Sequence, residues 1–371
     1  MVAYPCDWKE TQIGELFDIL AGGDVKKTHF SKSRTIKNPY EVFSNGIESR
    51  GIYGYTSKPI YPGNSLTVSA RGTIGQAFYR ENSFDAVIRL LVLMPKYSDV
   101  NPKFYEYFIN SKIYFEIENT GVPQLTVPKI KEKSVPLLSG VEQQATVSTL
   151  SDFDEHIDNL TELIEKKKAI RDGALDDLVS GKTRVDGFDD EWEKGVIEDI
   201  LTILHGRNQH SVESFDGKYP ILGSGGVIGK STEYLCDWEC VLIGRKGTID
   251  NPLYMNSPFW TIDTLYYSKP KSNQCVKFQY YLFCTIYWND YAESSGRPSL
   301  AKKVIEEIPI RIPSEPEQQA IAEILTAMDD EIESLETEKA KMMQIREGAM
   351  DDLLTGRVRL KYEEENVCQS N

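Results

Sequence analysis

An arginine, a glycine and a threonine follow a strand-like apolar run in each half of the sequence. The first run is Arg71-Gly72-Thr73, and the second is Arg245-Lys246-Gly247-Thr248. An arginine can bridge a guanine edge or a phosphate, and a threonine hydroxyl can contact a phosphate. The alternative is a turn that needs its glycine for backbone geometry and leaves its arginine solvated. The chemistry that these residues offer is therefore hydrogen bonding to a nucleic acid.

Further polar and aromatic residues occupy matching positions in the two halves. Gln124 and Ser299 stand between a proline and a leucine in two similar turns. Amides can read base edges, whereas lysines and hydroxyls more often hold phosphates. Each residue has the alternative of being a solvated loop residue. The remaining candidates by position are Asn45, Tyr53, Tyr55 and Thr126 in the first half, and Ser224, Lys230, Arg297, Lys302 and Lys303 in the second.

No set of residues in the sequence has the spacing of a catalytic or metal site. The four histidines are scattered, and there is no H-E-x-x-H, nucleophile elbow or C-x-x-C. A DNA methyltransferase needs an Asn/Asp-Pro-Pro-aromatic turn, and Asn38-Pro39-Tyr40 lacks the second proline. Cys236 and Cys240 have no second pair or nearby histidine to complete a zinc site. We therefore expect no catalytic residues, no bound metal and no cofactor on this chain.

Composition indicates a cytoplasmic protein with an uneven charge distribution. No apolar run reaches the roughly 18 residues of a membrane span, and six cysteines without regular spacing suggest a reduced compartment. The net charge is −15, with +3 in residues 1–140, −7 in 141–190, −3 in 191–315 and −8 in 316–371. The acidity is thus concentrated outside the two longer segments, which can still present basic faces to DNA.

The acidic segments are two copies of one pattern. Glu142-Gln143-Gln144-Ala145 opens the first copy and Glu317-Gln318-Gln319-Ala320 opens the second, at an offset of 175 positions. Apolar residues in each copy recur at intervals of three and four, the a/d pattern of a coiled coil. The predicted seam consists of Leu150, Phe153, Ile157, Leu160, Ile164, Leu325, Met328, Ile332, Leu335 and Met342. Each copy is therefore predicted to be one long helix.

Start and stop signals agree with this prediction. Ser139 precedes Glu142 by three positions and Ser314 precedes Glu317 by three, which are capping-box sequences. Gly181 and Gly356 stand where a left-handed helix stop is expected.

A globular segment precedes each predicted helix, and the two segments also resemble each other. Trp8–Ile19 matches Trp192–Ile203, and glycine-rich turns follow in both. Packed helices in this order most easily run antiparallel, so one chain would mimic a symmetric dimer. We predict an α+β chain with a pseudo-two-fold repeat, in which two antiparallel coiled-coil helices separate two α/β domains. The boundaries are residues 1–140, 141–185, 186–315 and 316–360, with a C-terminal tail at 361–371.

The whole pattern resembles the specificity subunit of a type I restriction-modification enzyme. The resemblance rests on the E-Q-Q-A helices that close at L-V-S-G-K and L-L-T-G-R, each preceded by a G-x-P-x-L turn. It implies two target-recognition domains that each read half of a bipartite site in double-stranded DNA. It also implies that the helices dock two methyltransferase subunits, which bind S-adenosylmethionine, and that restriction and translocation subunits join for cleavage.

The predicted helix length is consistent with a spacer. A helix from Glu142 to Ser180 would be about 58 Å long at 1.5 Å per residue. At about 3.4 Å per base pair, that length spans roughly 17 base pairs at most.

Two rival interpretations remain open from sequence. One is a specificity subunit whose partner carries methyltransferase and nuclease in a single chain. The other is a coiled-coil scaffold with two ligand-binding domains and no role on DNA.

Overall fold

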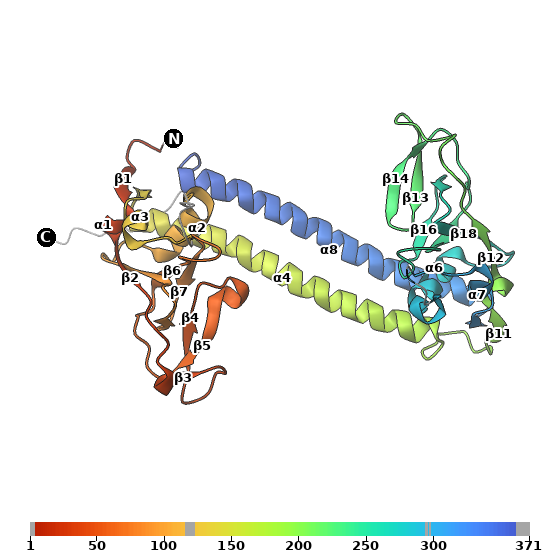
Figure 1. Ribbon diagram of the computed structural model, residues 1–371, viewed down its shortest axis with the longest axis horizontal. Coiled ribbons are helices and arrows are strands. Elements are labelled where there is room, and N and C mark those ends of the chain that lie inside the picture. Colours follow the sequence, from red (N-terminus) through yellow and green to blue (C-terminus); the bar gives the residue numbers. More distant parts are fainter. Residues whose placement is uncertain (1–3, 116–122, 294–295, 297, 361–371) are drawn as a thin grey trace. The chain divides into compact units, whose positions relative to one another are not determined.

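The computed structural model of the 371-residue chain describes residues 4–115, 123–293, 296 and 298–360. The chain divides into two compact units (Figure 1). Unit 1 comprises residues 1–159 and 338–371, and unit 2 comprises residues 160–337. Each unit thus combines one globular part with a segment of each long helix.

The globular part of unit 1 contains two four-stranded sheets. The first sheet has the order β2-β9-β6-β7, with antiparallel neighbours, and the second has the order β3-β5-β4-β8, in which only β4 and β8 are parallel. The first is built from β2 (Phe17–Ala21), β9 (Leu91–Pro95), β6 (Ser65–Val68) and β7 (Ala77–Arg80). The second is built from β3 (Phe30–Ser31), β5 (Ile52–Thr56), β4 (Tyr40–Phe43) and β8 (Asp85–Ala86). A separate ribbon pairs β1 (Lys9–Gln12) with β10 (Ser134–Leu137).

Short helices pack on this framework. The helix α2 (Pro102–Lys112) begins where Asn101 accepts a hydrogen bond from the backbone of Lys103, and Pro102 occupies the first turn. Its aromatic face, with Phe104 and Tyr105, is fully buried against the first sheet. The other helical segments are α1 (Ile13–Leu16), α3 (Val127–Lys131), η1 (Lys27–His29) and η2 (Glu48–Gly51).

Unit 2 repeats this architecture. Its first sheet has the order β12-β18-β15-β16, its second has the order β14-β13-β17, and β11 pairs with β19. The strands are β11 (Glu193–Val196), β12 (Leu201–His205), β13 (Tyr219–Gly223), β14 (Gly226–Ser231), β15 (Cys240–Gly244), β16 (Leu253–Met255), β17 (Trp260–Thr261), β18 (Leu265–Pro270) and β19 (Pro309–Ile312). The helical segments are α5 (Ile197–Ile200), α6 (Val276–Thr285), η3 (Trp288–Tyr291) and α7 (Lys302–Glu306).

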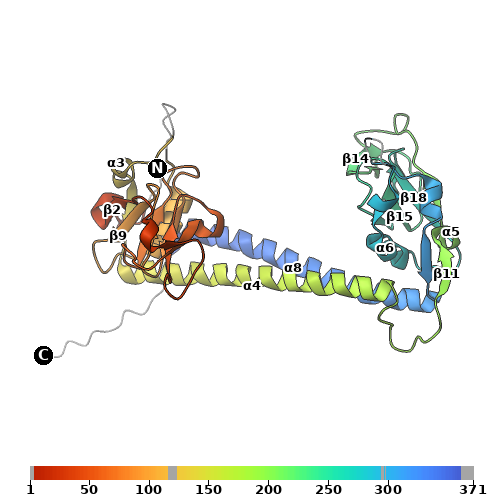
Figure 2. The same ribbon diagram turned by 60° about the horizontal axis from the view of Figure 1, so that its bottom comes forward.

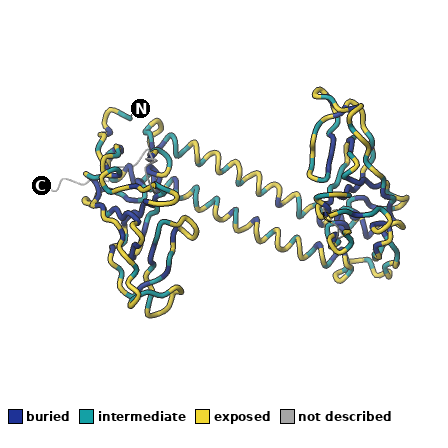
Figure 3. The backbone as a smooth tube through the Cα atoms, in the orientation of Figure 1, coloured by how far each residue is buried: buried dark blue, intermediate teal, exposed yellow. Residues whose placement is uncertain are grey.

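The two predicted long helices are α4 (Gly140–Val179) and α8 (Glu315–Thr355). Within each unit they lie side by side and antiparallel (Figure 2). In unit 1 the ion pairs join Asp154 to Arg346 and His156 to Glu338, and in unit 2 they join Lys167 to Glu331 and Arg171 to Asp329. All ten predicted seam residues are buried or partly buried. Residues on the outer faces of both helices are mostly exposed (Figure 3).

Each unit has a core that includes the helix ends. In unit 1, Val147 and Leu150 of α4 and Leu353 and Leu354 of α8 join the apolar residues beneath the first sheet. In unit 2, Leu175 to Val179 and Ile321 to Leu325 contribute in the same way. The helix pair is therefore anchored in each core rather than attached at the surface. None of the helices in the described parts of the chain has the length and hydropathy of a membrane span.

The helix ends follow the predicted signals in part. Gly181 and Gly356 have φ of 73° and 71°, the left-handed conformation expected after a helix. Ser139 Oγ accepts a hydrogen bond from the Glu142 amide at 3.2 Å, as a capping serine should. The Glu142 carboxylate, however, accepts hydrogen bonds from Trp8 Nε1 and from Arg359. The reciprocal half of the predicted capping box is thus replaced by tertiary contacts.

Candidate nucleic-acid interface

Three predicted residues from distant parts of unit 1 meet beside the end of β6. The guanidinium of Arg71 donates a hydrogen bond to Gln124 Oε1 at 3.0 Å. Asn45 Oδ1 accepts from the amides of Ala70 (2.7 Å) and Arg71 (3.3 Å). The loop after β4 and the segment before α3 therefore both hold the Arg71 loop. We call Asn45, Arg71 and Gln124 the unit 1 turn cluster.

The Arg71 loop is tightly closed. Ser69 Oγ donates to the carbonyl oxygen of Thr73 at 2.5 Å, and the amide of Leu125 donates to the carbonyl oxygen of Ala70 at 2.9 Å. Gly72 has a φ of 70°, which a residue with a Cβ adopts at a cost. The closed loop leaves the side chains of Arg71 and Thr73 exposed.

Unit 2 contains an equivalent cluster. Ser224 Oγ donates to the carbonyl oxygen of Lys246 at 2.8 Å, and Lys246 forms a β-bridge with Ser299. The amide of Leu300 donates to the carbonyl oxygen of Arg245 at 2.9 Å. Arg245 Nη1 also donates to the carbonyl oxygen of Asp263 at 3.2 Å. We call Ser224, Lys246 and Ser299 the unit 2 turn cluster.

Backbone hydrogen bonds align the two clusters residue by residue. Leu125 binds Ala70 in unit 1 as Leu300 binds Arg245 in unit 2, so Arg71 corresponds to Lys246. Both precede a glycine with positive φ. The two clusters therefore present different side chains on one scaffold, namely Asn45, Arg71 and Gln124 against Ser224, Lys246 and Ser299.

Other predicted residues of unit 1 lie away from these contacts. Tyr53 lies on β5 in the second sheet, where the Lys32 ammonium is 4.0 Å from its ring centroid. Tyr55 is on the same strand, opposite Glu41 and Ser31. Thr126 is exposed and precedes the first residue of α3. The structure thus brings together Asn45, Arg71 and Gln124, with Thr73 on the same loop.

In unit 2 the remaining candidates are distributed similarly. Lys230 is exposed on β14, opposite Pro220. Lys302 and Lys303 begin α7 and form ion pairs with Glu306 (3.5 Å) and Glu307 (3.6 Å). Thr248 is exposed, and its carbonyl oxygen would lie 1.8 Å from a Cβ at Gly244, so only glycine fits there. Arg297 lies outside the described residues.

Sequence reasoning missed the turns that border both clusters. In unit 1, Asn45 Nδ2 donates to the carbonyl oxygen of Ile88 at 2.6 Å, and the next residue, Arg89, is exposed. In unit 2, Arg245 donates to the backbone of Asp263 and Thr264. The run from Val87 to Pro95 gives no glycine or asparagine signal for a turn and reads as one apolar strand.

A buried arginine, Arg80, supports the loop of unit 1 that contains Arg50. The Arg80 guanidinium lies 3.5 Å from the Phe43 ring centroid and donates to Thr67 Oγ1 and to the carbonyl oxygen of Arg50. Burial lowers the pKa of Arg80 to about 9, and the positive charge of Arg50 acts in the same direction. This side chain is therefore a structural support and is not available to a ligand.

Polar networks connect each globular part to its helices. In unit 1, Tyr107 of α2 donates to Asp154 at 2.6 Å, and Asp154 also accepts from Arg346 at 2.5 Å. In unit 2, Tyr281 of α6 donates to Asp329 at 2.7 Å, and Asp329 also accepts from Arg171 at 2.8 Å. Burial is the main cause that raises the pKa of both tyrosines, and the neighbouring carboxylates add to it.

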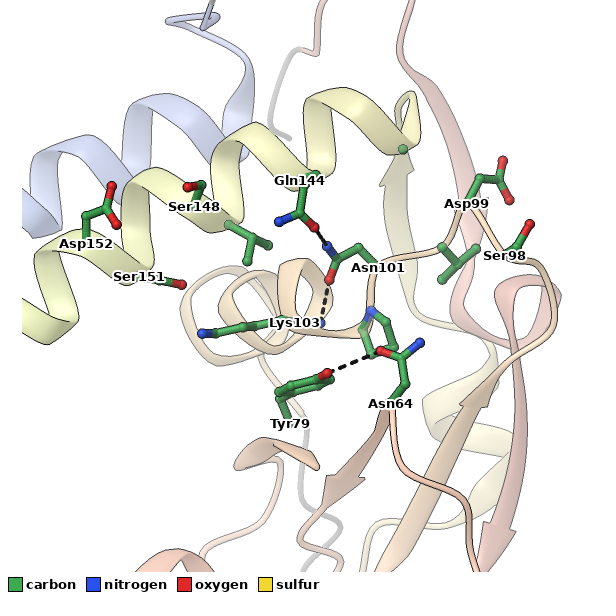
Figure 4. Close-up of a pocket in the computed structure, with 14 residues that line it drawn as sticks. Asn64, Tyr79, Ser98, Asp99, Asn101, Lys103, Gln144, Ser148, Ser151 and Asp152 are labelled. Atoms are coloured by element: carbon green, nitrogen blue, oxygen red, sulfur yellow. Dashed lines mark hydrogen bonds between the residues drawn. The ribbon is translucent and has the colours of Figure 1, made fainter. Parts of the chain in front are cut away.

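A polar groove accompanies this junction in each unit. In unit 1 it has a volume of about 570 Å³ and lies between the sheet edge and α4. Figure 4 shows Asn101 pointing to Gln144, while Tyr79 points to Asn64, at hydrogen-bond distances of 2.9 and 3.3 Å. The unit 2 groove has about 640 Å³. Its residues Tyr254, Lys277 and Gln319 hold the places of Tyr79, Lys103 and Gln144.

In the described ranges no three residues among His, Cys, Asp and Glu are arranged to hold a metal. Cys236 and Cys240 are buried, with sulfur atoms 3.8 Å apart; Cys240 is the first residue of β15, and Cys236 forms a β-bridge with Phe259. Both cysteines belong to an apolar cluster that also contains Leu222, Leu242 and Phe259.

Comparisons with known proteins give one consistent family. The model of the type I restriction modification DNA specificity domain matches residues 5–169 and again residues 189–343. A putative type I specificity subunit of Mycoplasma genitalium is 24% identical over 94% of both chains. The MjaVIII specificity subunit of Methanocaldococcus jannaschii is 21% identical over 96% of this chain and 94% of that one.

A solved structure shares the fold. The S subunit of a type I restriction-modification system from M. genitalium superposes with a TM-score of 0.68 and 22% identity, covering 94% of this chain and 96% of that chain. The two domain matches cover most of the chain and coincide with the two structural repeats. The chain therefore belongs to the family of type I restriction-modification DNA specificity subunits.

Proposed function

We propose that this chain recognises a bipartite DNA site, with one globular part for each half of the site. The observation that carries the proposal is the pair of turn clusters. They share backbone hydrogen bonds but differ in the side chains at corresponding positions. Direct readout of DNA depends on side-chain donors and acceptors at base edges, so such clusters suit two different half-sites.

The proposal assigns recognition to this chain and chemistry to its partners. The clusters contain amide, guanidinium, ammonium and hydroxyl groups, and these groups are suited to base edges and phosphates. Methyl transfer would then occur on two methyltransferase subunits that bind S-adenosylmethionine. Restriction and translocation subunits would join the complex for cleavage.

The two grooves support docking of two identical partner subunits. Each groove lies between a globular part and the first turns of a long helix, and corresponding residues line both. A partner that fits Gln144, Lys103 and Tyr79 in unit 1 would meet Gln319, Lys277 and Tyr254 in unit 2. A repeated surface on one chain therefore accounts for two copies of one subunit.

The long helices would set the unread gap between the half-sites. α4 has 40 residues and α8 has 41. At 1.5 Å per residue, a 40-residue helix is about 60 Å long. The gap would then depend on helix length, while the half-sites would depend on the turn clusters.

The function is tested by co-expressing the chain with its methyltransferase partner in a host without other methylation systems. Methylome sequencing of the wild type should give one bipartite motif. Arg71→Ala should cost about 1–3 kcal/mol of discrimination and relax one half-site only. Lys246→Ala should weaken methylation through the other half-site.

Two outcomes would contradict the proposal. One is a wild-type motif without two separated parts. The other is the same altered base position for the Arg71 and Lys246 variants, since the two residues would then serve one half-site. Val358→Ala, at an exposed position after α8, is the matched control.

A further inference from the structure

The turn that joins β8 to β9 in unit 1 has an unfavourable sequence. The amide of Leu90 donates to the carbonyl oxygen of Val87 at 3.2 Å, which closes a four-residue turn. The two central residues, Ile88 and Arg89, have φ of 57° and 63°. Positive φ at both central positions marks a type I′ turn, which normally contains Asn-Gly or Gly-Gly. A β-branched isoleucine in this conformation is a rare exception.

The surrounding structure enforces this conformation. The amides of Ile88 and Arg89 donate to the carbonyl oxygens of Gly23 (3.0 Å) and Gly22 (3.2 Å). A Cβ at Gly22 would lie 2.6 Å from the carbonyl oxygen of Ala86, so the close approach requires glycine there. Asn45 holds the opposite side of the turn through the carbonyl oxygen of Ile88. Strained residues persist where neighbouring contacts determine their conformation in this way.

Burial of the side chains does not offset the strain. Ile88 is 43% exposed, and Arg89 is also exposed. Within the described part of the chain, the Arg89 side chain has no hydrogen bond or ion pair. The same Asn45 amide binds both this turn and the Arg71 loop, so Arg89 lies on the border of the turn cluster. Local rules of this kind are typically broken at functional sites.

Unit 2 has a turn at the corresponding place. The amide of Leu265 donates to the carbonyl oxygen of Ile262 at 3.1 Å, and Asp263 and Thr264 occupy the two central positions. Their carbonyl oxygens accept hydrogen bonds from Arg245. The position of the turn is thus common to both units, whereas its two central residues differ.

We infer that the Ile88-Arg89 turn is a DNA-reading element of unit 1 and that Arg89 is a specificity-determining residue. This inference rests on the proposed function. The Arg89 guanidinium donates to the acceptor edge of a guanine, the commonest specific side-chain contact with DNA. Ile88 offers an apolar contact to an adjacent base, such as a thymine methyl group. Contacts of these two side chains with DNA then account for the presence of Ile-Arg in a turn that Asn-Gly would form without strain.

The test uses the full chain with its methyltransferase subunits and compares three variants. Arg89→Lys keeps the charge but loses the planar fork, so methylation of the wild-type site should fall about ten- to hundred-fold and one base position should relax. The double variant Ile88→Asn with Arg89→Gly supplies a favourable turn sequence. It should melt no lower than the wild type and still lose recognition of the same half-site. Arg34→Ala, an exposed arginine of unit 1, is the control.

The outcomes separate this inference from the proposed function. A change confined to one half-site in both Arg89 variants supports the turn as a reading element. A wild-type bipartite motif that both variants methylate at the wild-type rate overturns the inference and leaves the proposed function intact. A wild-type complex that methylates no bipartite motif overturns both.

Discussion

At the scale of single residues, a largely buried carboxylate on α2 of unit 1 links stability to pH. The Glu106 side chain on α2 is 13% exposed, and Arg50 Nη2 is 3.3 Å away. The positive charges of Arg50, Lys103 and Arg80 and a backbone hydrogen bond from Tyr79 each act to lower the pKa of Glu106. Desolvation is the largest influence, and the net result is a raised pKa.

Glu106→Gln should therefore gain stability relative to the wild type as the pH rises. An acid with a raised pKa in the folded state binds more protons folded than unfolded, so its contribution to stability falls with pH. The fall begins near the unfolded pKa, at about 4.3, and ends above the raised folded pKa. Native-state hydrogen exchange of α2 amides at pH 4, 5, 6 and 7 would measure it. A free energy of unfolding that falls in the variant relative to the wild type as the pH rises would refute the assignment, and Glu48→Gln controls for lost charge.

Residue types in the sequence pointed to hydrogen-bonding side chains beside glycine turns, and their contact with DNA stays a prediction. Arg71, Asn45 and Gln124 do lie together. The Ile88-Arg89 turn could not be predicted, because its sequence favours an extended strand and only tertiary hydrogen bonds impose positive φ. The correspondence of Arg71 with Lys246 could not be predicted either, because it depends on which backbone carbonyl in each loop accepts the hydrogen bond from Leu125 or Leu300.

At the scale of elements, an arginine that follows the other helix and a tryptophan of the globular part together hold the start of each long helix. In unit 1, Arg359 and Trp8 bind the Glu142 carboxylate. In unit 2, Arg184 and Trp192 bind the Glu317 carboxylate, whose side chain is only 1% exposed. A buried carboxylate left without donors is costly, so these contacts hold the helix pair in register.

Trp192→Phe should lower the free energy of unfolding of unit 2 by about 1.5–3 kcal/mol, the usual contribution of a hydrogen bond to a charged group. The lost bond joins Trp192 Nε1 to Glu317 Oε2 at 2.9 Å. Hydrogen exchange should report the loss in the first turns of α8 and leave α2 of unit 1 unchanged. Trp8→Phe should instead lower protection in the first turns of α4 and leave α6 of unit 2 unchanged. Equal loss of protection in both units from either variant would disprove the local role of these clamps.

The sequence predicted helices better than strands for a physical reason. Both long helices form where the apolar spacing predicts them, because a period of three and four residues that is sustained over several turns has few other interpretations. The strands have only two to six residues, and many are buried on both faces. Such strands lack the alternating pattern that would reveal their pairing, so the two-sheet arrangement of each unit came only from the structure.

At the scale of the whole molecule, the proposed spacer makes the gap adjustable without altering the half-sites. The ion pairs His156–Glu338 in unit 1 and Arg171–Asp329 in unit 2 identify which residues of α4 and α8 correspond. By this register, the two-turn segment 161–167 of α4 corresponds to the two-turn segment 333–339 of α8. Removal of both preserves the seven-residue seam repeat on each side.

This paired deletion should shorten the unread gap by about three base pairs and leave both half-sites unchanged. Seven residues correspond to about 10 Å of helix, and DNA rises about 3.4 Å per base pair. Methylome sequencing of a host that expresses the variant with its methyltransferase would read gap and half-sites together. A deletion in α4 alone is the control, because it breaks the register and should abolish methylation instead of shifting it. An unchanged gap, or a changed base within a half-site, would show that the helices do not set the spacing.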